Sequence, residues 1–171
     1  CDGDACGIGL LREHRAKDDL CDFGHSFGGH GGGRGGLACG VVDAQIDAGG
    51  QGSVIEVTGE DVVIRGLLLT GSGSAHQSID SGVQMTRTAR RVLVEGNRIE
   101  GNLYGVDIHG AKDSIVRGNT IIGRQDHRMN ERGNAIYVWN APGAVVEGND
   151  VRFGRDGIFT NTSRKNIFRN N

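Results

Sequence analysis

Residues 92–99 read VLVEGNRI, and the pattern returns as SIVRGNTI at residues 114–121 and as AVVEGNDV at residues 144–151. Each copy is a short β-type run that ends in Gly-Asn and is followed by one residue and then Ile or Val. Weaker copies are DVVIRGL at residues 61–67 and NIFRN at residues 166–170. The copies follow one another at steps of 30, 22, 30 and about 22 residues. Regular steps of this size indicate a repeat architecture.

A second apolar run lies about fourteen residues before each Asn. A coil of about 22 residues can make one triangular turn of a solenoid with three short strands, each pairing in parallel with its copy in the next coil at about 4.8 Å. Alternate apolar residues then point inward, and stacked coils bury them together. The sequence therefore predicts an all-β fold, a single-stranded right-handed parallel β-helix of about five coils. The 30-residue steps are coils with about eight extra residues in a loop. The second runs are residues 82–85, 105–108, 135–138 and 157–160.

The recurring Asn residues are expected at one corner of the coils. Asn tolerates a left-handed or bridge backbone conformation, and this tolerance would explain its recurrence at a corner. Its side-chain amide can also hydrogen-bond to the Asn of the next coil. The predicted structural positions are Asn97, Asn119, Asn149 and Asn170.

Composition supports this fold over its alternatives. Gly is counted at 31 of 171 residues, which suits many turns and disfavours a helical bundle, since interior Gly costs about 1 kcal/mol against Ala. A β-sandwich with Gly turns stays as an alternative, but it does not explain why the Gly-Asn dipeptide recurs at steps of 22 and 30 residues. A leucine-rich repeat lacks its L-x-x-L-x-L pattern here. Net charge is −2, so the basic footprint of a nucleic-acid binder is missing, and no apolar run is long enough for a transmembrane helix.

Residues 1–43 depart from the repeat and are expected to form a separate, irregular segment before a β-helix of residues 44–171. Three interpretations stay open for this segment: a metal site, a disulfide pair whose connectivity is undetermined, or a disordered or non-native stretch. No paired zinc-ligand spacing such as C-x2-C occurs in it. It holds Cys1, Cys6, Cys21 and Cys39, together with His14, His25, His30 and a Gly-rich run over residues 28–36.

Candidate metal ligands lie on a predicted strand and in the second long loop. His127 and Met129 share that loop, and imidazole with thioether would suit copper, with His109 or Met85 to complete the site. The alternative is that Met129 packs the loop against the coils and that His127 is exposed to solvent. His109 also follows Asp107 on one face of a strand, with Ile108 inward; the pair suits metal binding or acid–base chemistry, or is a solvated outer face.

Tyr137 and Trp139, which alternate with inward Ile136 and Val138, form either a candidate partner or ligand surface or a pair of rings covered by the loop just before them. The arginines of the loop, Arg124, Arg128 and Arg132, extend this surface. They also surround three carboxylates, for which salt bridges that pin the loop to neighbouring coils compete with a catalytic groove. These carboxylates are Asp126, Glu131 and Asp156.

Four stretches resemble the NosD family more specifically than the Gly-Asn repeat does. They are GRQDHRMNERGN at residues 123–134, VWNAPG at residues 138–143, RFGRDGIF at residues 152–159 followed by Asn161-Thr162-Ser163, and QIDAGGQGSVI at residues 45–55. The family continues for several more coils, so the resemblance implies that the chain is a fragment.

The resemblance implies a non-catalytic accessory role in the maturation of nitrous oxide reductase, with assembly of its copper–sulfur centre. It also implies a periplasmic location and copper as the cofactor. The implied partners are ABC transporter subunits and the copper or reductase proteins of that system. No catalytic residue is carried over, because none is established for the family. The alternatives are a carbohydrate-active or carbohydrate-binding β-helix, such as a lyase or hydrolase, and a structural solenoid of an adhesin or surface fibre.

Overall fold

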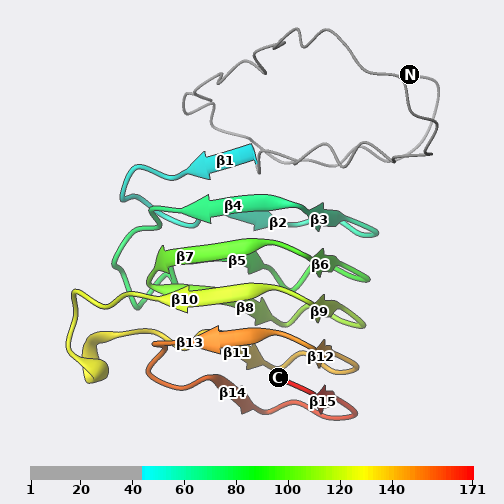
Figure 1. Ribbon diagram of the computed structural model, residues 1–171. Helices are drawn as coiled ribbons and strands as arrows, with labels where there is room; N and C mark the ends of the chain where they lie inside the picture. Colours follow the sequence, from blue (N-terminus) through cyan, green and yellow to red (C-terminus); the bar gives the residue numbers. More distant parts are fainter. Residues whose placement is uncertain (1–43) are drawn as a thin grey trace, which may run out of the picture.

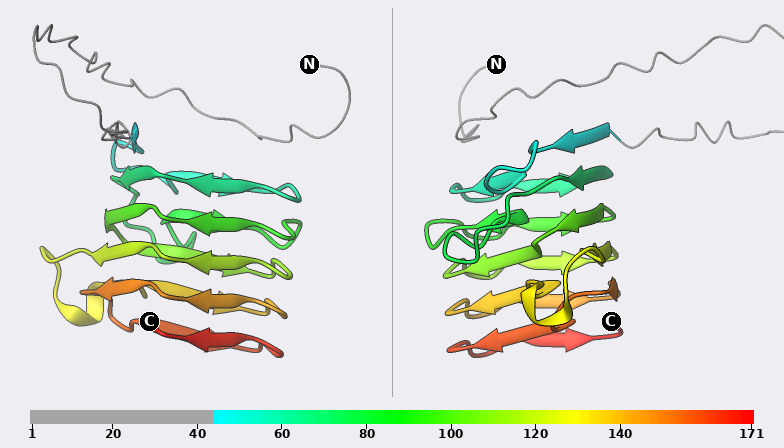
Figure 2. Two further views of the ribbon diagram at one scale, coloured as in Figure 1. Left: turned by 45° about the vertical axis from the view of Figure 1, so that its right-hand side comes forward. Right: turned by 90° about the vertical axis from the view of Figure 1, so that its left-hand side faces the viewer.

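The computed structural model describes residues 44–171, which wind into five coils of three short strands each. Figure 1 shows the coils stacked from β1 to β15, and Figure 2 shows the same stack from two further sides. Equivalent strands of successive coils form three parallel five-stranded sheets. Sheet 1 contains β1 (Ala44–Asp47), β4 (Leu67–Thr70), β7 (Arg98–Asn102), β10 (Thr120–Gly123) and β13 (Asp150–Arg152).

The other two sheets complete the triangular coil. Sheet 2 contains β2 (Ile55–Val57), β5 (Ser81–Met85), β8 (Tyr104–His109), β11 (Ile136–Trp139) and β14 (Ile158–Asn161). Sheet 3 contains β3 (Val63–Arg65), β6 (Leu93–Glu95), β9 (Ile115–Arg117), β12 (Val145–Glu147) and β15 (Ile167–Arg169). The predicted parallel β-helix of about five coils is confirmed.

The interior is a set of aliphatic columns, one or two from each sheet. In sheet 1, Leu69, Ile99 and Ile121 are register partners and at most 1% exposed. Sheet 3 contributes a similar column in which Val146 is fully buried. Parallel strands pair residue for residue here, so each inward side chain packs on its copy one coil away. Sheet 2 adds Val83, Val106 and Ile136 in one column and Met85, Ile108 and Val138 in another.

The tight corner from sheet 3 to sheet 1 carries the Gly-Asn dipeptides. Gly96, Gly118 and Gly148 have φ of +62°, +61° and +62°, so it is Gly that adopts the left-handed conformation expected of Asn. The buried Asn side chains form a ladder: the Asn119 Oδ1 atom accepts from the Asn97 side-chain amide at 3.0 Å. The expected amide bond between coils is therefore confirmed, and the left-handed conformation expected as one option for these Asn residues is wrong.

The last copy of this corner corrects one predicted position. Asn170 has φ +54° and stands where earlier coils have Gly. Its neighbour Asn171 continues the ladder, because its Oδ1 atom accepts from the Asn149 side-chain amide at 2.8 Å. In the first copy Leu67 takes the Asn position, and its backbone N–H donates to Asn97 Oδ1 at 3.1 Å.

The predictions for residues 1–43, including the cysteine and histidine interpretations, lie outside the described residues. Within the described part, no helix is long and apolar enough to cross a membrane. The one helical turn there is a 3₁₀ helix, η1 (Met129–Glu131).

Candidate functional site

The two 30-residue steps arise from two long loops at the same corner, between sheet 1 and sheet 2. The first insertion, residues 71–80, joins β4 to β5, and the second insertion, residues 124–135, joins β10 to β11. Both leave the solenoid on one side, where sheet 1 strands end (Figure 1). One coil separates them, and at this corner that coil has only Leu103 between β7 and β8.

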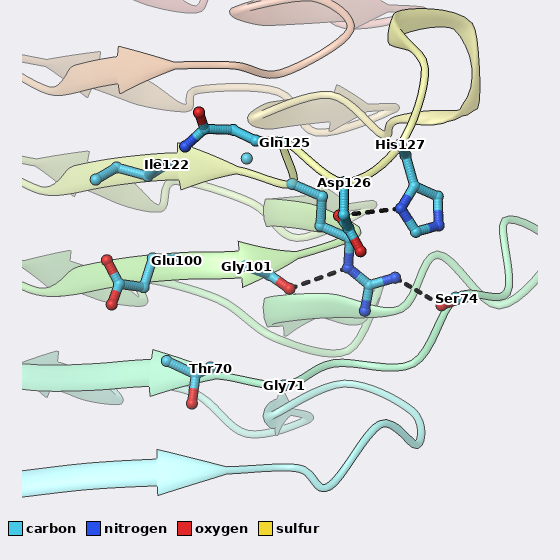
Figure 3. Close-up of a pocket in the computed structure, with 11 residues that line it drawn as sticks. Thr70, Gly71, Ser74, Glu100, Gly101, Ile122, Gln125, Asp126 and His127 are labelled. Atoms are coloured by element: carbon cyan, nitrogen blue, oxygen red, sulfur yellow. Dashed lines mark hydrogen bonds and ion pairs between the residues drawn. The ribbon is translucent and has the colours of Figure 1, made fainter.

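Arg124 ties the second insertion to the coils before it. Its Nη1 atom donates to Ser74 Oγ at 2.6 Å, and its Nη2 atom donates to the Ser72 carbonyl at 2.6 Å. Its Nε atom donates to the Gly101 carbonyl of the intervening coil at 3.0 Å. Figure 3 marks the contacts at Ser74 and Gly101 with dashed lines. A planar guanidinium with several fixed donors suits such a bridge.

His76 makes the return contact from the first insertion. Its Nε2 atom lies 3.0 Å from the Glu131 carbonyl oxygen, and its Nδ1 atom lies 3.1 Å from the Tyr104 hydroxyl. Since a carbonyl only accepts, Nε2 carries the hydrogen; in the neutral ring Nδ1 then accepts from Tyr104. Sequence reasoning missed His76, which belongs to no motif. We call His76, Tyr104, Arg124 and Glu131 the corner clamp.

An open cleft of about 690 Å³ lies beside the clamp, between the ends of the sheet 1 strands and the second insertion (Figure 3). Its lining includes the acidic side chains of Glu100 and Asp126, the guanidinium of Arg124 and the imidazole of His127. The Asp126 Oδ1 and His127 Nδ1 atoms are 3.0 Å apart, and this contact lowers the pKa of Asp126. Glu100 is paired with Arg98 at 2.6 Å. The cleft is polar, and its acidic groups already have partners.

The structure does not bring the three suggested copper ligands together. His127 lies at the corner before sheet 2 begins, whereas His109 is the last residue of β8, at the far end of that sheet. Met129 is 67% exposed, so it does not pack the loop down, and Met85 is fully buried in the core. Among residues 44–171, no group of three or more His, Cys, Asp or Glu side chains is arranged to hold a metal ion. The residues suggested as copper ligands therefore do not form one site within residues 44–171.

The loop arginines bind backbone rather than carboxylates. Arg132 donates from Nε to the His127 carbonyl at 2.9 Å, and from Nη1 to the Phe153 carbonyl at 3.4 Å. Arg128 is exposed and makes no ion pair with residues of the described part. Salt bridges to neighbouring coils, expected from the sequence, therefore do not pin the loop; hydrogen bonds to carbonyl groups do.

The three carboxylates of this region are not gathered in one groove. Asp126 contacts His127, and Glu131 accepts from the Arg128 backbone N–H at 3.3 Å. Asp156 pairs with its neighbour Arg155 at 3.3 Å. Each carboxylate has its own local partner, so these contacts do not supply the paired geometry of a glycosidase.

The outer surface of sheet 2 carries a row of aromatic rings that begins next to the corner clamp. Tyr137 lies 5.9 Å from Tyr104 and 5.6 Å from Phe159, measured between ring centroids. Trp139 stacks on His109 at 6.1 Å with an interplanar angle of 22°. We call these five residues the aromatic face. Tyr137 and Trp139 thus share the outer side of one strand, opposite Ile136 and Val138, as their alternation predicts.

A buried carboxylate lies within this face. Asp107 is the register partner of Gln84 on one side and Tyr137 on the other, and it is 0% exposed. Neither of its oxygen atoms has a hydrogen-bond partner among the described residues, and the nearby His109 Nδ1 atom, 3.9 Å away, has none either. Burial raises the pKa of Asp107 to about 7, against the opposing effect of the Gln84 amide.

This arrangement corrects one expectation from the sequence. Ile108 points inward as expected, but Asp107 does not lie on a solvated face. Burial also lowers the pKa of His109, so burial disfavours the charged form of both groups. A neutral carboxylic acid can donate one hydrogen bond and accept another, which is the chemistry this position offers.

Comparisons with known proteins agree with this architecture. The family described as "Right handed beta helix region" matches residues 38–171. A protein named "Probable ABC transporter binding protein NosD" from Stutzerimonas stutzeri is 38% identical over 114 residues, covering 67% of this chain and 26% of that protein. The protein of the same name from Pseudomonas aeruginosa is 30% identical over 114 residues, covering 67% and 27%. The chain thus spans about a quarter of these relatives; it belongs to the right-handed β-helix family and is similar to NosD.

Proposed function

We propose that this chain is part of a NosD-type accessory protein that acts with an ABC transporter outside the cytoplasm. We propose further that this accessory protein assists the assembly of the copper–sulfur centre of nitrous oxide reductase. Its similarity to two proteins named as ABC transporter binding proteins supports the transporter as a partner. The role of residues 44–171 is recognition rather than metal holding, because their side chains do not assemble a set of metal ligands.

One observation carries this proposal: the repeat is interrupted twice at a single corner, and the interruptions are joined to each other beside the aromatic face. A regular solenoid presents similar surfaces along its whole length, so a partner needs an irregular feature to find one position. Binding residues tend to gather in loops that a rigid scaffold positions. The corner clamp provides such a position.

The aromatic face supplies side chains suited to a protein contact. Tyr137, Trp139 and Phe159 are each partly exposed on consecutive strands of sheet 2. Tyr, Trp and Phe are enriched at protein interfaces, and Trp and Tyr dominate among residues whose truncation weakens binding. We therefore place the partner over sheet 2, with the second insertion at its edge.

The test is binding of the full-length protein that contains this chain to the purified ABC transporter, measured by surface plasmon resonance. We expect Trp139→Ala and Phe159→Ala each to weaken binding by about tenfold or more, as for central aromatic contacts. Val63→Ala is the control, because Val63 is 58% exposed on sheet 3. Unchanged binding of both aromatic variants would refute the placement on sheet 2.

A carbohydrate ligand is the second candidate, favoured by the same row of rings, because aromatic side chains can stack on the apolar faces of sugars. Its test is titration with oligosaccharides, followed by the fluorescence of Trp139, the single tryptophan of the chain. A saturable change that Phe159→Ala weakens would support this candidate. Transporter binding with no response to oligosaccharides would favour the accessory protein.

A further inference from the structure

The turns from sheet 2 to sheet 3 stack into a second regular corner. Arg91 donates from its backbone N–H to the Lys112 carbonyl at 3.0 Å, and Asp113 donates likewise to the Pro142 carbonyl at 3.1 Å. The same bond joins Gly143 to the Arg164 carbonyl at 3.1 Å. These repeated bonds place equivalent residues of successive coils in one line. That line is Glu60, Arg90, Lys112, Pro142 and Arg164.

Charge is balanced at the start of this line. Glu60 pairs with Arg90 at 3.3 Å and with Arg91 at 2.7 Å, and Asp61 pairs with Arg91 at 2.6 Å. These two acidic and two basic side chains therefore neutralise one another, and Arg87 of the second turn takes no part in the pairs. Such exposed pairs add little stability.

Charge is not balanced outside these ion pairs. Arg87, Lys112 and Arg164 make no ion pair with any residue in the part of the chain that the structure describes. The one carboxylate within these later turns, Asp113, is directed at the next turn: its Oδ1 atom lies 2.3 Å from where a Cβ of Gly143 would stand. Three cationic side chains thus come together without a counter-charge.

These three side chains line one cavity of about 540 Å³, in which no acidic residue takes part. Arg87 belongs to the longer turn of the second coil and lies over Gly110, whose φ is +74°. A Cβ at Gly110 would stand 2.7 Å from the Arg87 Cβ, so the close approach of the two turns needs Gly there. Asn140 and Thr162 add an amide and a hydroxyl to the lining.

We propose that this cavity binds a tetrahedral oxyanion, the phosphate or sulfate group of a small molecule, between Arg87, Lys112 and Arg164. A guanidinium offers two parallel N–H donors to such an anion, and the Lys ammonium adds a compact charge. The volume falls in the range of small-molecule sites and leaves room for more than the anionic group itself. This site lies outside the aromatic face, at the turns that follow the C-terminal ends of the sheet 2 strands, and the two proposals are tested by different variants.

The experiment is titration of the purified chain with inorganic phosphate and with sulfate, at constant ionic strength set by sodium chloride, followed by NMR chemical shifts. We expect saturable shifts at residues 110–112 and 162–164. Lys112→Gln and Arg164→Gln should each weaken binding at least tenfold. Arg152→Gln removes the same charge from sheet 1, where Arg152 pairs with Asp150, and should leave binding unchanged. The side chains of Lys112, Arg164 and Arg152 are all exposed, so none of these substitutions should disturb the core. Melting temperatures confirm that each variant is folded.

Three outcomes would overturn the proposal. The first is a response that stays linear up to tens of millimolar anion. The second is an equal loss of binding in Arg152→Gln, which would indicate diffuse attraction rather than a site. The third is binding to phosphatidylglycerol vesicles without binding of inorganic phosphate, which would indicate a charged membrane-facing surface instead of an anion cavity.

Discussion

His76 and Glu131 are 55 positions apart in the sequence, yet the His76 Nε2 atom lies 3.0 Å from the Glu131 carbonyl oxygen. This contact joins the two insertions across the coil between them, and Arg124 repeats the connection in the opposite direction. The corner clamp is therefore held from both sides, although each insertion alone is a surface loop.

The first prediction concerns this clamp. Arg124→Ala removes donors to the carbonyls of Ser72 and Gly101, and hydrogen bonds from a charged group contribute about 1.5–3 kcal/mol. We expect amide hydrogen exchange in residues 71–80 and 124–135 to accelerate by about tenfold to a hundredfold, while exchange in sheet 3 stays unchanged. His76→Ala should give a smaller effect in the same segments. Acceleration throughout the coils would contradict a local role.

The second prediction concerns Asp107. Its pKa is about 7 in the folded chain and near 3.8 when unfolded, so the unfolded chain releases this proton first as pH rises. Folding stability should therefore fall between about pH 4 and pH 7 and then level off, by up to about 4 kcal/mol. Asp107→Asn should remove this slope and exceed the wild type in stability at pH 8. Urea unfolding at pH 5 and pH 8 measures both; an unchanged slope in the variant would exclude Asp107 as its source.

The third prediction uses the only tryptophan as a probe. Trp139 stacks on His109, and a protonated imidazole quenches indole fluorescence. Because burial disfavours the imidazolium, fluorescence should fall only in acid, with a midpoint below the ordinary value of 6.5. His109→Gln should abolish the fall. A midpoint above 6.5 would instead mean that Asp107 is ionised and pairs with His109.

The fourth prediction tests the coil register with one substitution at two valines of sheet 3. Val146 is fully buried, whereas Val63 is 58% exposed. An unpaired charge in the core costs several kcal/mol, on the order of the stability of a small domain, so Val146→Asp should unfold the chain. Ile121→Asp should do the same from sheet 1, and Val63→Asp should melt close to the wild type. Circular dichroism melting curves distinguish them, and a wild-type melt for Val146→Asp would refute the register.

The fifth prediction concerns the Asn ladder. Asn119→Ala leaves the buried Asn97 backbone N–H without its partner, at about 1–3 kcal/mol, and it also removes the bonds that the Asn119 amide makes to the Val94 carbonyl and to Asn149. We expect a loss of about 2–4 kcal/mol in the free energy of unfolding, measured in urea. Asn130→Ala, at an exposed position of η1, should cost much less. Equal losses in the two variants would argue against a special role for the ladder.

The repeat was readable because its chemistry is local. A Gly-Asn corner and alternating apolar residues recur whatever the rest of the chain does, so strands, inward residues and coil number could be predicted. The shared position of the two insertions also left a signal. In every coil the second apolar run keeps its distance of about fourteen residues to the Asn, which places the extra residues before that run.

Other features depend on contacts that no spacing encodes. The burial of Asp107 follows from neighbours in adjacent coils, Gln84 and Tyr137, and an outward strand position alone indicates solvent. His76 meets Glu131 only because both insertions bend towards the same coil. The separation of His109 from His127 likewise required knowing at which end of sheet 2 each residue lies.

The corner clamp also fixes the distance between the two insertions along the solenoid axis. Coils are added at about 4.8 Å each, and each hydrogen-bonds only to its neighbours, so a whole repeat can be duplicated or lost without disturbing the columns elsewhere. Between the two insertions, however, a repeat cannot be duplicated or lost without breaking the contacts of the clamp. A second copy of residues 98–119 would keep the core and the ladder intact, but it would carry His76 beyond reach of Glu131 and Arg124 beyond reach of Ser74. The spacing of the two loops is therefore tied to one intervening coil, while the number of coils outside them is free to change in evolution or by design.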